Sequence, residues 1–360
     1  MFITKYGSLF GTVPPTTGRV FFVSPTDGYV IDGQTFPASD DNDGLSPQKA
    51  LRTIARFVTL ATANAGETAI LLEGDHSVGA TPVGISKAGL TILGLHSQHG
   101  KSNRLRKKAT VTSTGHSIFD VYADDFELGY AEIRNDSLYS GITFGTESLA
   151  GRTVDGLYIH DCVFRLGRSE PNPGTGTAGQ GVGINFGARR RYVAATAGMS
   201  VGVQFNTDVL ATGYIEDCVF IAEGRSGPGI VLATCQVHMK GNRFIGATAW
   251  NTAINVATNA SACLLEDSVF TAQYSWTVPI LANVGDAQTH QGSIYIRNCD
   301  FGLPFSDARK PLDGFVLGTN HGGTALWGGN CFIMTATGAR AMFKTATLGQ
   351  QYSIDDPLIT

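Results

Sequence analysis

The chain repeats one short pattern of apolar and polar positions. An aliphatic residue is followed by a variable position, then by Asp, Asn or Gly, then by a small or amide residue, a second variable position and an aromatic residue. Clear and looser copies of this pattern lie at residues 128–133, 159–164, 215–220, 239–244, 265–270, 296–301 and 327–332. A pattern that recurs in this way indicates a repeated structural unit.

The order of residue types predicts a strand, a one-residue bend and a second strand. Asp, Asn and Gly best tolerate a left-handed backbone conformation, so the third position is expected to form the bend. Alternate side chains of a strand face the same side, so the aliphatic, small and aromatic positions are expected to face inward. The small and aromatic positions form a predicted structural ladder of Cys162, Cys218, Asn242, Ser268, Cys299 and Asn330 with Phe164, Phe220, Phe244, Phe270, Phe301 and Phe332.

The spacing of the pattern predicts a solenoid. Its last position falls at Ile133 and then at six phenylalanines, with gaps of 31, 56, 24, 26, 31 and 31 residues. If the gap of 56 contains one degenerate copy, the step is about 28 residues, which lies within the range of solenoid repeats. About ten such coils fit between residues 68 and 340, and at ~4.8 Å per coil they give a rod about 45 Å long.

The six cysteines do not form a disulfide framework in a chain of this length. On the same interpretation Cys162 and Cys218 lie two coils apart, near ~9.6 Å, which is too far for a disulfide. We therefore expect buried free thiols. A zinc site is not indicated, because the sequence contains no CxxC pair.

The first 36 residues do not carry the repeat. Pro14 and Pro15 predict an extended or turn segment, and residues 19–23 then predict a strand. This segment is either an arm that docks on a partner or along its own chain, or a strand folded back on its own domain. Both alternatives are compatible with the sequence.

Residues 37–67 predict a turn and a helix. The run from Asp40 to Gly44 resembles a calcium loop, but the EF-hand register puts Ala50 where the bidentate Glu belongs, so a turn is favoured. Ser46 followed by Pro47 begins a helix, and apolar positions at helical spacing extend it for about four turns to near residue 66. We expect this helix to cap the open end of the first coil.

Short strands are expected from residue 68 onward, at 69–72, 90–93, 110–112 and 117–121. The predicted organisation is an N-terminal arm over 1–36, a turn and capping helix over 37–67, a solenoid over 68–343 and a tail over 344–360. The tail either closes the last coil or reaches a neighbouring molecule.

Composition narrows the class of function. Among 360 residues 45 are glycine, 16% are charged and the formal net charge is −4, so nothing indicates a nucleic-acid or membrane-surface binder. There is no run of the ~20 apolar residues that a transmembrane helix needs. The first residues lack the features of a signal peptide. We expect a soluble chain that is not exported.

Several stretches together resemble a known superfamily. The resemblance is carried by the run from Asp41 to Pro47, by Ala50 with Thr53 and Ile54, by residues 69–76 and by the repeated bends. It is to right-handed parallel β-helix proteins of the pectate-lyase-like superfamily, and it covers most of residues 38–335. Among these, a short chain with a Tyr-Gly-Ser-Leu-Phe-Gly start at residues 6–11 most resembles β-helix virion proteins of tailed bacteriophages. The expected fold class is therefore all-β, a right-handed parallel β-helix with an N-terminal capping α-helix.

The resemblance implies a structural role. It favours a capsid decoration, or cement, protein on the outer surface of the phage head, acting as a homotrimer that binds the major capsid protein. The alternative is a tailspike or fibre module that binds or depolymerises host surface polysaccharide, with Trp250, Tyr274, Trp276 and Trp327 as the first candidates for exposed aromatics. A bacterial surface adhesin is a third possibility, and the missing export signal argues against it.

Enzymatic motifs of the superfamily are largely missing. Of the hydrolase pattern the chain has Asn206-Thr207-Asp208, but residues 227–230 lack the paired Asp, and His238 lacks flanking glycines. A ladder of Asp161, Asp217 and Asp267 could bind cations for a lyase, yet left-handed bends explain these residues better. No cofactor, metal or catalytic site is expected.

The basic runs are candidate partner-binding sites. They could meet an acidic capsid surface or an anionic polysaccharide, or they could be solvated loop charges without a partner. Together with two aromatics of the N-terminal segment, the candidate partner-binding residues are Tyr6, Phe10, Arg104, Arg106, Lys107, Lys108, Arg189, Arg190 and Arg191.

Overall fold

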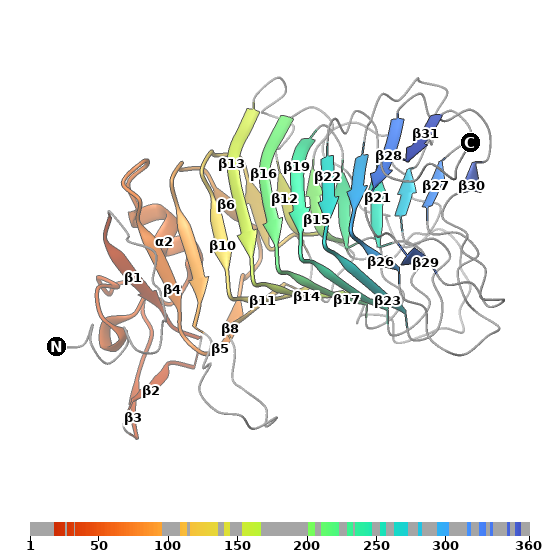
Figure 1. The fold of residues 1–360 in the computed structure, drawn as a ribbon. Coiled ribbons are helices and arrows are strands. Elements are labelled where there is room, and N and C mark those ends of the chain that lie inside the picture. The colour runs from red at the N-terminus through yellow and green to blue at the C-terminus, as the bar shows by residue number, and fades with distance from the viewer. Residues whose placement is uncertain are drawn as a thin grey trace, which may run out of the picture.

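A computed structural model gives the architecture of the chain (Figure 1). It describes residues 18–25, 27–31, 33–95, 109–113, 116–135, 140–144, 153–166, 201–205, 210–222, 229–232, 235–246, 253–256, 263–272, 280–282, 294–301, 315–317, 324–328, 332–333, 344–345 and 350–353.

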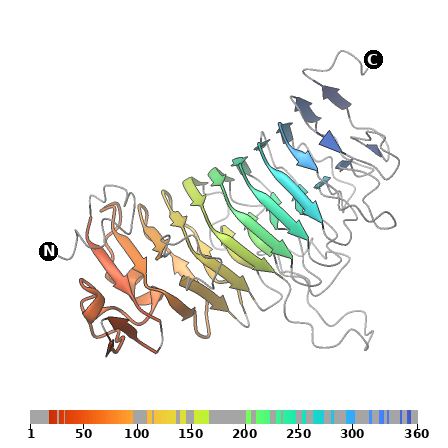
Figure 2. The ribbon, with the colours of Figure 1, turned by 60° about the horizontal axis from the view of Figure 1, so that its bottom comes forward.

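Three parallel sheets dominate the described residues. The first sheet has eleven strands, and the second and third have nine each. From β4 onward each strand is hydrogen-bonded to the third strand after it, so the chain visits the three sheets in turn and then begins again one strand further along. The strands therefore stack along one axis (Figures 1 and 2). The fold is all-β and parallel, as the sequence predicted at this level.

The strands of the first sheet are β1 (Val20–Val23), β4 (Thr68–Leu71), β7 (Thr91–Gly94), β10 (Glu127–Gly129), β13 (Thr153–His160), β16 (Leu210–Glu216), β19 (Cys235–Lys240), β22 (Cys263–Glu266), β25 (Ile294–Arg297), β28 (Thr324–Gly328) and β31 (Gln350–Ser353). Those of the second are β5 (Gly74–Ser77), β8 (Ala109–Ser113), β11 (Glu132–Asn135), β14 (Val163–Leu166), β17 (Val219–Ala222), β20 (Arg243–Gly246), β23 (Val269–Ala272), β26 (Asp300–Phe301) and β29 (Phe332–Ile333). Those of the third are β6 (Val83–Ile85), β9 (Phe119–Val121), β12 (Ser140–Phe144), β15 (Val201–Phe205), β18 (Ile230–Leu232), β21 (Ile254–Val256), β24 (Ile280–Ala282), β27 (Phe315–Leu317) and β30 (Lys344–Thr345). A short hairpin, β2 (Tyr29–Ile31) with β3 (Gln34–Phe36), stands apart.

The bend between the first and second sheets is a single left-handed residue. Asp161, Asp217 and Asp267 each have φ of 51°, Asn298 has 52° and Gly241 has 65°. These are the positions where the repeated pattern requires Asp, Asn or Gly, so the prediction of a one-residue bend is confirmed. In the earliest copy a tyrosine, Tyr130, takes the same conformation with φ of 58°.

The positions after the bend form a buried ladder. Cys162, Cys218, Asn242, Ser268 and Cys299 are fully buried. Two positions later, phenylalanine rings of neighbouring strands stack nearly parallel, with centroid separations of 4.8, 5.0 and 4.7 Å along the series Phe164, Phe220, Phe244 and Phe270. Asn330 and the side chains of Phe301 and Phe332 lie outside the described residues.

The interpretation of the 56-residue gap as two coils is wrong. β13 pairs directly with β16, and β14 pairs directly with β17, so Cys162 and Cys218 lie in neighbouring coils. The additional residues fall between β14 and β15, at a corner between sheets, where an insertion leaves the register of the strands unchanged. The described strands make nine sets of three. The five described cysteines are buried free thiols, as expected.

The N-terminal helix is shorter than predicted. Pro47–Lys49 forms a 3-10 turn, Ala50 is extended, and only Ile54–Leu60 forms an α-helix, α2. Leu51 breaks the helical run because its backbone bridges to Val23 of β1. The Thr53 side chain then caps α2 by accepting a hydrogen bond from the Arg56 amide. The prediction of a helix of about four turns is therefore wrong.

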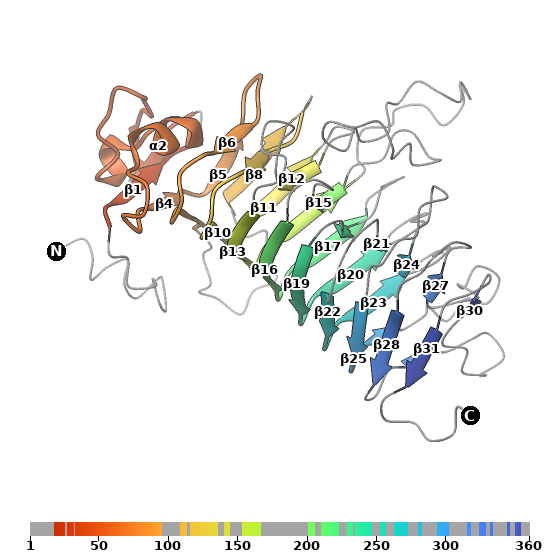
Figure 3. The same cartoon turned by 90° about the horizontal axis from the view of Figure 1, so that it is seen from above.

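Helix α2 lies at the N-terminal end of the stack (Figure 3). Ile54, Phe57 and Val58 are buried and belong to the same apolar core as the strands. The rings of Phe57 and Phe21 meet edge to face at 5.5 Å. Strand β1 pairs in parallel with β4, so residues 20–23 form a strand folded back on its own domain.

Candidate functional site

All of the predicted partner-binding residues lie outside the described part of the chain. This holds for Tyr6 and Phe10, for the basic run of Arg104, Arg106, Lys107 and Lys108, and for Arg189, Arg190 and Arg191. It also holds for Trp250, Tyr274 and Trp276, and for the side chain of Trp327 in β28. Their roles remain predictions.

The acidic run that resembles a calcium loop is used as a turn. Asp40 accepts hydrogen bonds from the backbone amides of Arg52 and Thr53 at 3.0 and 2.9 Å, and from the Thr53 hydroxyl at 3.0 Å. The Asp43 carboxylate accepts from the Leu45 amide. These contacts fix the chain before α2. Among the described residues no group of three or more His, Cys, Asp or Glu side chains is arranged to hold a metal ion.

The hydrolase motif is not assembled among the described residues. Residues 206–208 lie outside them. His238 stands on β19, where its Nε2 atom is 3.1 Å from Glu266 Oε2 on the next strand, β22. That hydrogen bond gives His238 a structural partner.

The structure instead brings together a set of polar and aromatic side chains on the outer face of the first sheet. Register places Glu127, Tyr158, Tyr214 and His238 opposite one another on β10, β13, β16 and β19. Two residues further along, the same strands carry Gly129, His160, Glu216 and Lys240, followed by Glu266 on β22. We call this surface, with the bend residues Asp161, Asp217 and Asp267, the tyrosine-carboxylate face.

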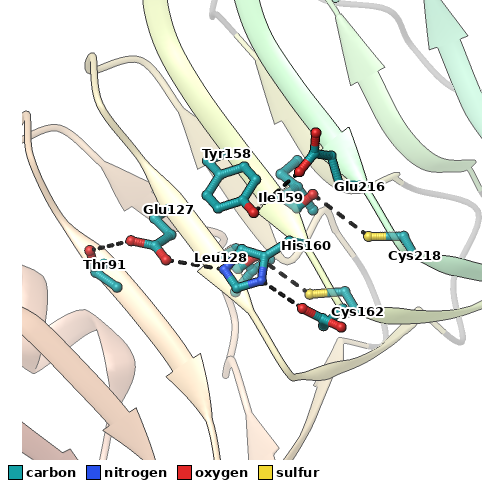
Figure 4. A network of polar contacts seen from close by, with 10 residues as sticks. Thr91, Glu127, Leu128, Tyr158, Ile159, His160, Cys162, Glu216 and Cys218 are labelled. Carbon is teal, nitrogen blue, oxygen red and sulfur yellow. Dashed lines mark hydrogen bonds and ion pairs between the residues drawn. The ribbon is translucent and has the colours of Figure 1, made fainter. Parts of the chain in front are cut away.

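His160 is the most enclosed member of this face (Figure 4). Its Nε2 atom lies 3.1 Å from Glu127 Oε1, and its Nδ1 atom lies 2.9 Å from Asp161 Oδ2. The Tyr158 ring stacks on the imidazole at 4.4 Å. Burial lowers the pKa of His160, but the hydrogen bonds to Glu127 and Asp161 outweigh burial and raise the pKa above its ordinary value.

The outward position of His160 in the repeated pattern would leave its side chain accessible to solvent. The side chain is on the outer face, yet only 6% of the residue is exposed. The cause is Gly129 on the neighbouring strand, since a Cβ atom there would lie 2.5 Å from His160 Cε1. The imidazole fills the space that this glycine leaves, and Tyr130 and Tyr158 cover it.

Two tyrosines remain exposed beside this cluster. Tyr158 is 36% and Tyr214 is 51% exposed, and they stand opposite each other on adjacent strands. The Tyr158 hydroxyl donates to Glu216 Oε2 at 3.3 Å. Burial and the nearby Glu216 carboxylate raise the pKa of Tyr158 to about 12, so the phenol is protonated at neutral pH.

The face carries an excess of negative charge. The pKa of Asp217 is raised, first by burial and then by repulsion from Asp161 and Glu216. Lys240 lies 4.0 Å from Asp267, at the outer limit of an ion pair. Around Asp217 the positive charge of Lys240 and His160 is therefore too weak to offset burial and the neighbouring carboxylates.

This arrangement suits binding better than proton transfer. Both imidazole nitrogens of His160 face carboxylate oxygens, so neither is free to take a proton from a substrate. The exposed tyrosine rings and the carboxylates offer flat apolar surface and hydrogen-bond acceptors. Sequence reasoning missed this surface, although aligning the repeat copies places Tyr158 and Tyr214 in one column.

Comparisons of the chain with protein-family models, with curated proteins and with solved structures found no match. Among the described residues no helix is long and apolar enough to cross a membrane.

Proposed function

We propose that the chain is a structural virion protein of a tailed bacteriophage, a right-handed parallel β-helix that decorates and stabilises the head shell as a homotrimer. The observation that carries this proposal is the continuous three-sheet stack with its buried ladder and stacked phenylalanines. With eleven strands in one sheet, the stack is about 48 Å long at ~4.8 Å per strand.

The stack is suited to a mechanical role because its coils resist sliding. Shifting one coil along its strands by a single residue would move the stacked phenylalanines out of contact and turn inward side chains outward. A rigid rod can hold loops and terminal segments at fixed positions. Many weak contacts made by such segments to neighbouring capsid subunits would add as avidity.

The proposal is tested on particles that lack the protein. Virions stripped of this chain, or produced without it, should lose their genome at lower temperature than complete virions, and adding back purified protein should restore the wild-type temperature. Equal heat resistance of complete and stripped particles would remove the cementing role.

A tailspike or fibre module that binds polysaccharide is the second candidate. The exposed Tyr158 and Tyr214 rings favour it, since flat aromatic surfaces with neighbouring Glu127 and Glu216 carboxylates suit sugar rings with hydroxyl groups. We expect binding without cleavage, because Glu127 is committed to His160 and Thr91. A reducing-end assay on capsular polysaccharides tests this, and release of new ends would support a depolymerase instead.

A further inference from the structure

The tyrosine-carboxylate face combines two exposed tyrosine rings with a group of carboxylates. Within the described residues the exposed large apolar or aromatic side chains are Val30, Leu45, Tyr158 and Tyr214, and the two tyrosines stand side by side. Tyrosine is enriched in protein interfaces because it offers a large apolar ring with a polar end. This pair therefore marks a surface that another molecule can cover.

The charge of the surface selects the chemistry of that molecule. Six carboxylates, those of Glu127, Asp161, Glu216, Asp217, Glu266 and Asp267, lie within a run of five adjacent strands, from β10 to β22. The basic side chains on the same strands are His160, His238 and Lys240, and the next strand, β25, carries Arg297 opposite Glu266. An anionic polymer would be repelled, whereas a cationic segment would gain from each carboxylate.

Arginine is the cation that fits best. Its planar guanidinium group can stack on a tyrosine ring and at the same time donate paired hydrogen bonds to a carboxylate. Tyr214 and Glu216 lie two residues apart on β16, so both point to the same side of the sheet. One arginine side chain could therefore contact both residues.

The chain itself contains such a segment. Arg189-Arg190-Arg191, followed by Tyr192, lies between the end of β14 at Leu166 and the start of β15 at Val201. Strand β14 belongs to the second sheet and β15 to the third, so neither end of this connection lies in the first sheet. The connection has 34 residues between these strands, enough to extend about 110 Å at most.

We propose that the tyrosine-carboxylate face is a self-association surface that binds the Arg189–191 segment of a second copy of this chain. Each copy carries one acidic face and one basic segment, so the contact is heterologous and can close into a ring. This inference deepens the homotrimeric part of the proposed function. Its test uses purified protein, so it can fail even if the particle experiment succeeds.

The first test is the mass of the full-length protein in solution, measured by sedimentation equilibrium. We expect association at about 0.1 M salt, where charges act over ~10 Å, and at least tenfold weaker association at about 1 M salt, where they act over ~3 Å. The change Tyr214→Ser should weaken association at least tenfold with unchanged circular dichroism. A protein that remains monomeric at low salt would overturn the inference.

A charge-exchange experiment identifies the occupant. One variant carries Glu216→Lys and Asp217→Asn, and asparagine is used at 217 because it tolerates the left-handed bend. The second carries Arg189→Glu, Arg190→Glu and Arg191→Glu. Each alone should associate at least tenfold more weakly than wild type, and their mixture should recover most of the affinity because the altered face and segment are complementary.

The other basic run provides the matched control. Replacing Arg104, Arg106 and Lys107 by glutamate changes the net charge by the same six units, and should change the association constant less than threefold. If this control variant loses association and the Arg189–191 variant keeps it, the Arg189–191 segment is not the occupant and the proposal is overturned. Tyr214-dependent binding of a neutral polysaccharide by a monomeric wild-type protein would overturn it in favour of a glycan site.

Discussion

Replacing Asn242 by alanine should destabilise the stack at one defined place. Asn242 is fully buried in the ladder. Its Nδ2 atom donates to the Ile215 carbonyl at 2.8 Å, and its Oδ1 atom accepts from the Cys218 amide at 3.0 Å. The alanine variant would leave this carbonyl and this amide buried without their partner. Each unsatisfied group costs about 1–3 kcal/mol, so we expect a total of roughly 2–6 kcal/mol.

The local effect is measured by hydrogen exchange of the Cys218 amide. Loss of about 1–3 kcal/mol at this group corresponds to exchange faster by roughly 5- to 150-fold, since a tenfold change is about 1.4 kcal/mol. The global effect is measured by urea unfolding, as the shift of the midpoint multiplied by the slope. Arg243→Ala, at an exposed neighbouring position, is the control and should change stability by no more than about 0.5 kcal/mol.

The change Asn242→Cys sharpens the test. Cysteine occupies this position in the preceding coil, where Cys218 Sγ faces the Ile159 carbonyl at 3.8 Å. A thiol at position 242 should restore a weak donor to the Ile215 carbonyl but not the acceptor for the Cys218 amide, so its loss of stability should be intermediate. If Asn242→Ala exchanges and unfolds like the wild type, the buried amide does not hold adjacent coils together and the reasoning is wrong.

Three further predictions concern the same stack. Gly129→Ala should displace the His160 ring, because the added Cβ would lie 2.5 Å from Cε1, and should cost about 1–3 kcal/mol in urea unfolding; an unchanged His160 resonance would contradict this. By NMR titration the pKa of His160 in the folded protein should lie above the unfolded value of 6.5, so the stability that protonated His160 contributes is complete below pH 6.5 and is lost as pH rises through the folded pKa. The change Asp161→Asn should lower the folded pKa of His160, and an unchanged titration curve would exclude Asp161 as a cause. Phe220→Ala should cost about 3–5 kcal/mol, because its ring is buried between two stacked rings, and a loss below about 1 kcal/mol would show that the rings do not support one another.

The bends and the ladder were predictable because they depend on local residue chemistry. A left-handed position strongly prefers Asp, Asn or Gly, and a buried position beside a tight corner has room for only a small or amide side chain. Asp161 and Cys162 satisfy both demands, and the same pair recurs at 217 and 218. Aligning the copies of the repeated pattern therefore identifies the left-handed bend and the small buried residue that follows it.

Other features depend on contacts between distant segments and escaped prediction. Ala50 and Leu51 fit a helical apolar pattern, but the backbone of Leu51 bridges to Val23, which lies 28 residues earlier in the sequence. The register of β13 with β16 is set by direct strand pairing, which the number of residues between them does not reveal. His160 is covered because Gly129 in the preceding coil makes room for it.

The tyrosine-carboxylate face escaped prediction for a related reason. Apart from the bend residues, its members are scattered from Glu127 to Glu266 in the sequence, and none of them belongs to a recognised motif. Only the parallel register puts Tyr158, Tyr214 and Glu216 side by side. In a stack of coils, positions that vary between repeat copies become neighbours across strands, so candidate surfaces are found by reading the copies in columns.

The most direct test of the proposed function is to locate the protein on intact virions. Gold-labelled antibodies raised against the purified chain would be applied to phage particles and viewed by electron microscopy. The account predicts regular labelling over the outer surface of the head. Labelling confined to the tail would favour the polysaccharide-binding module, and intact virions that carry no label would contradict the assignment as a virion surface protein.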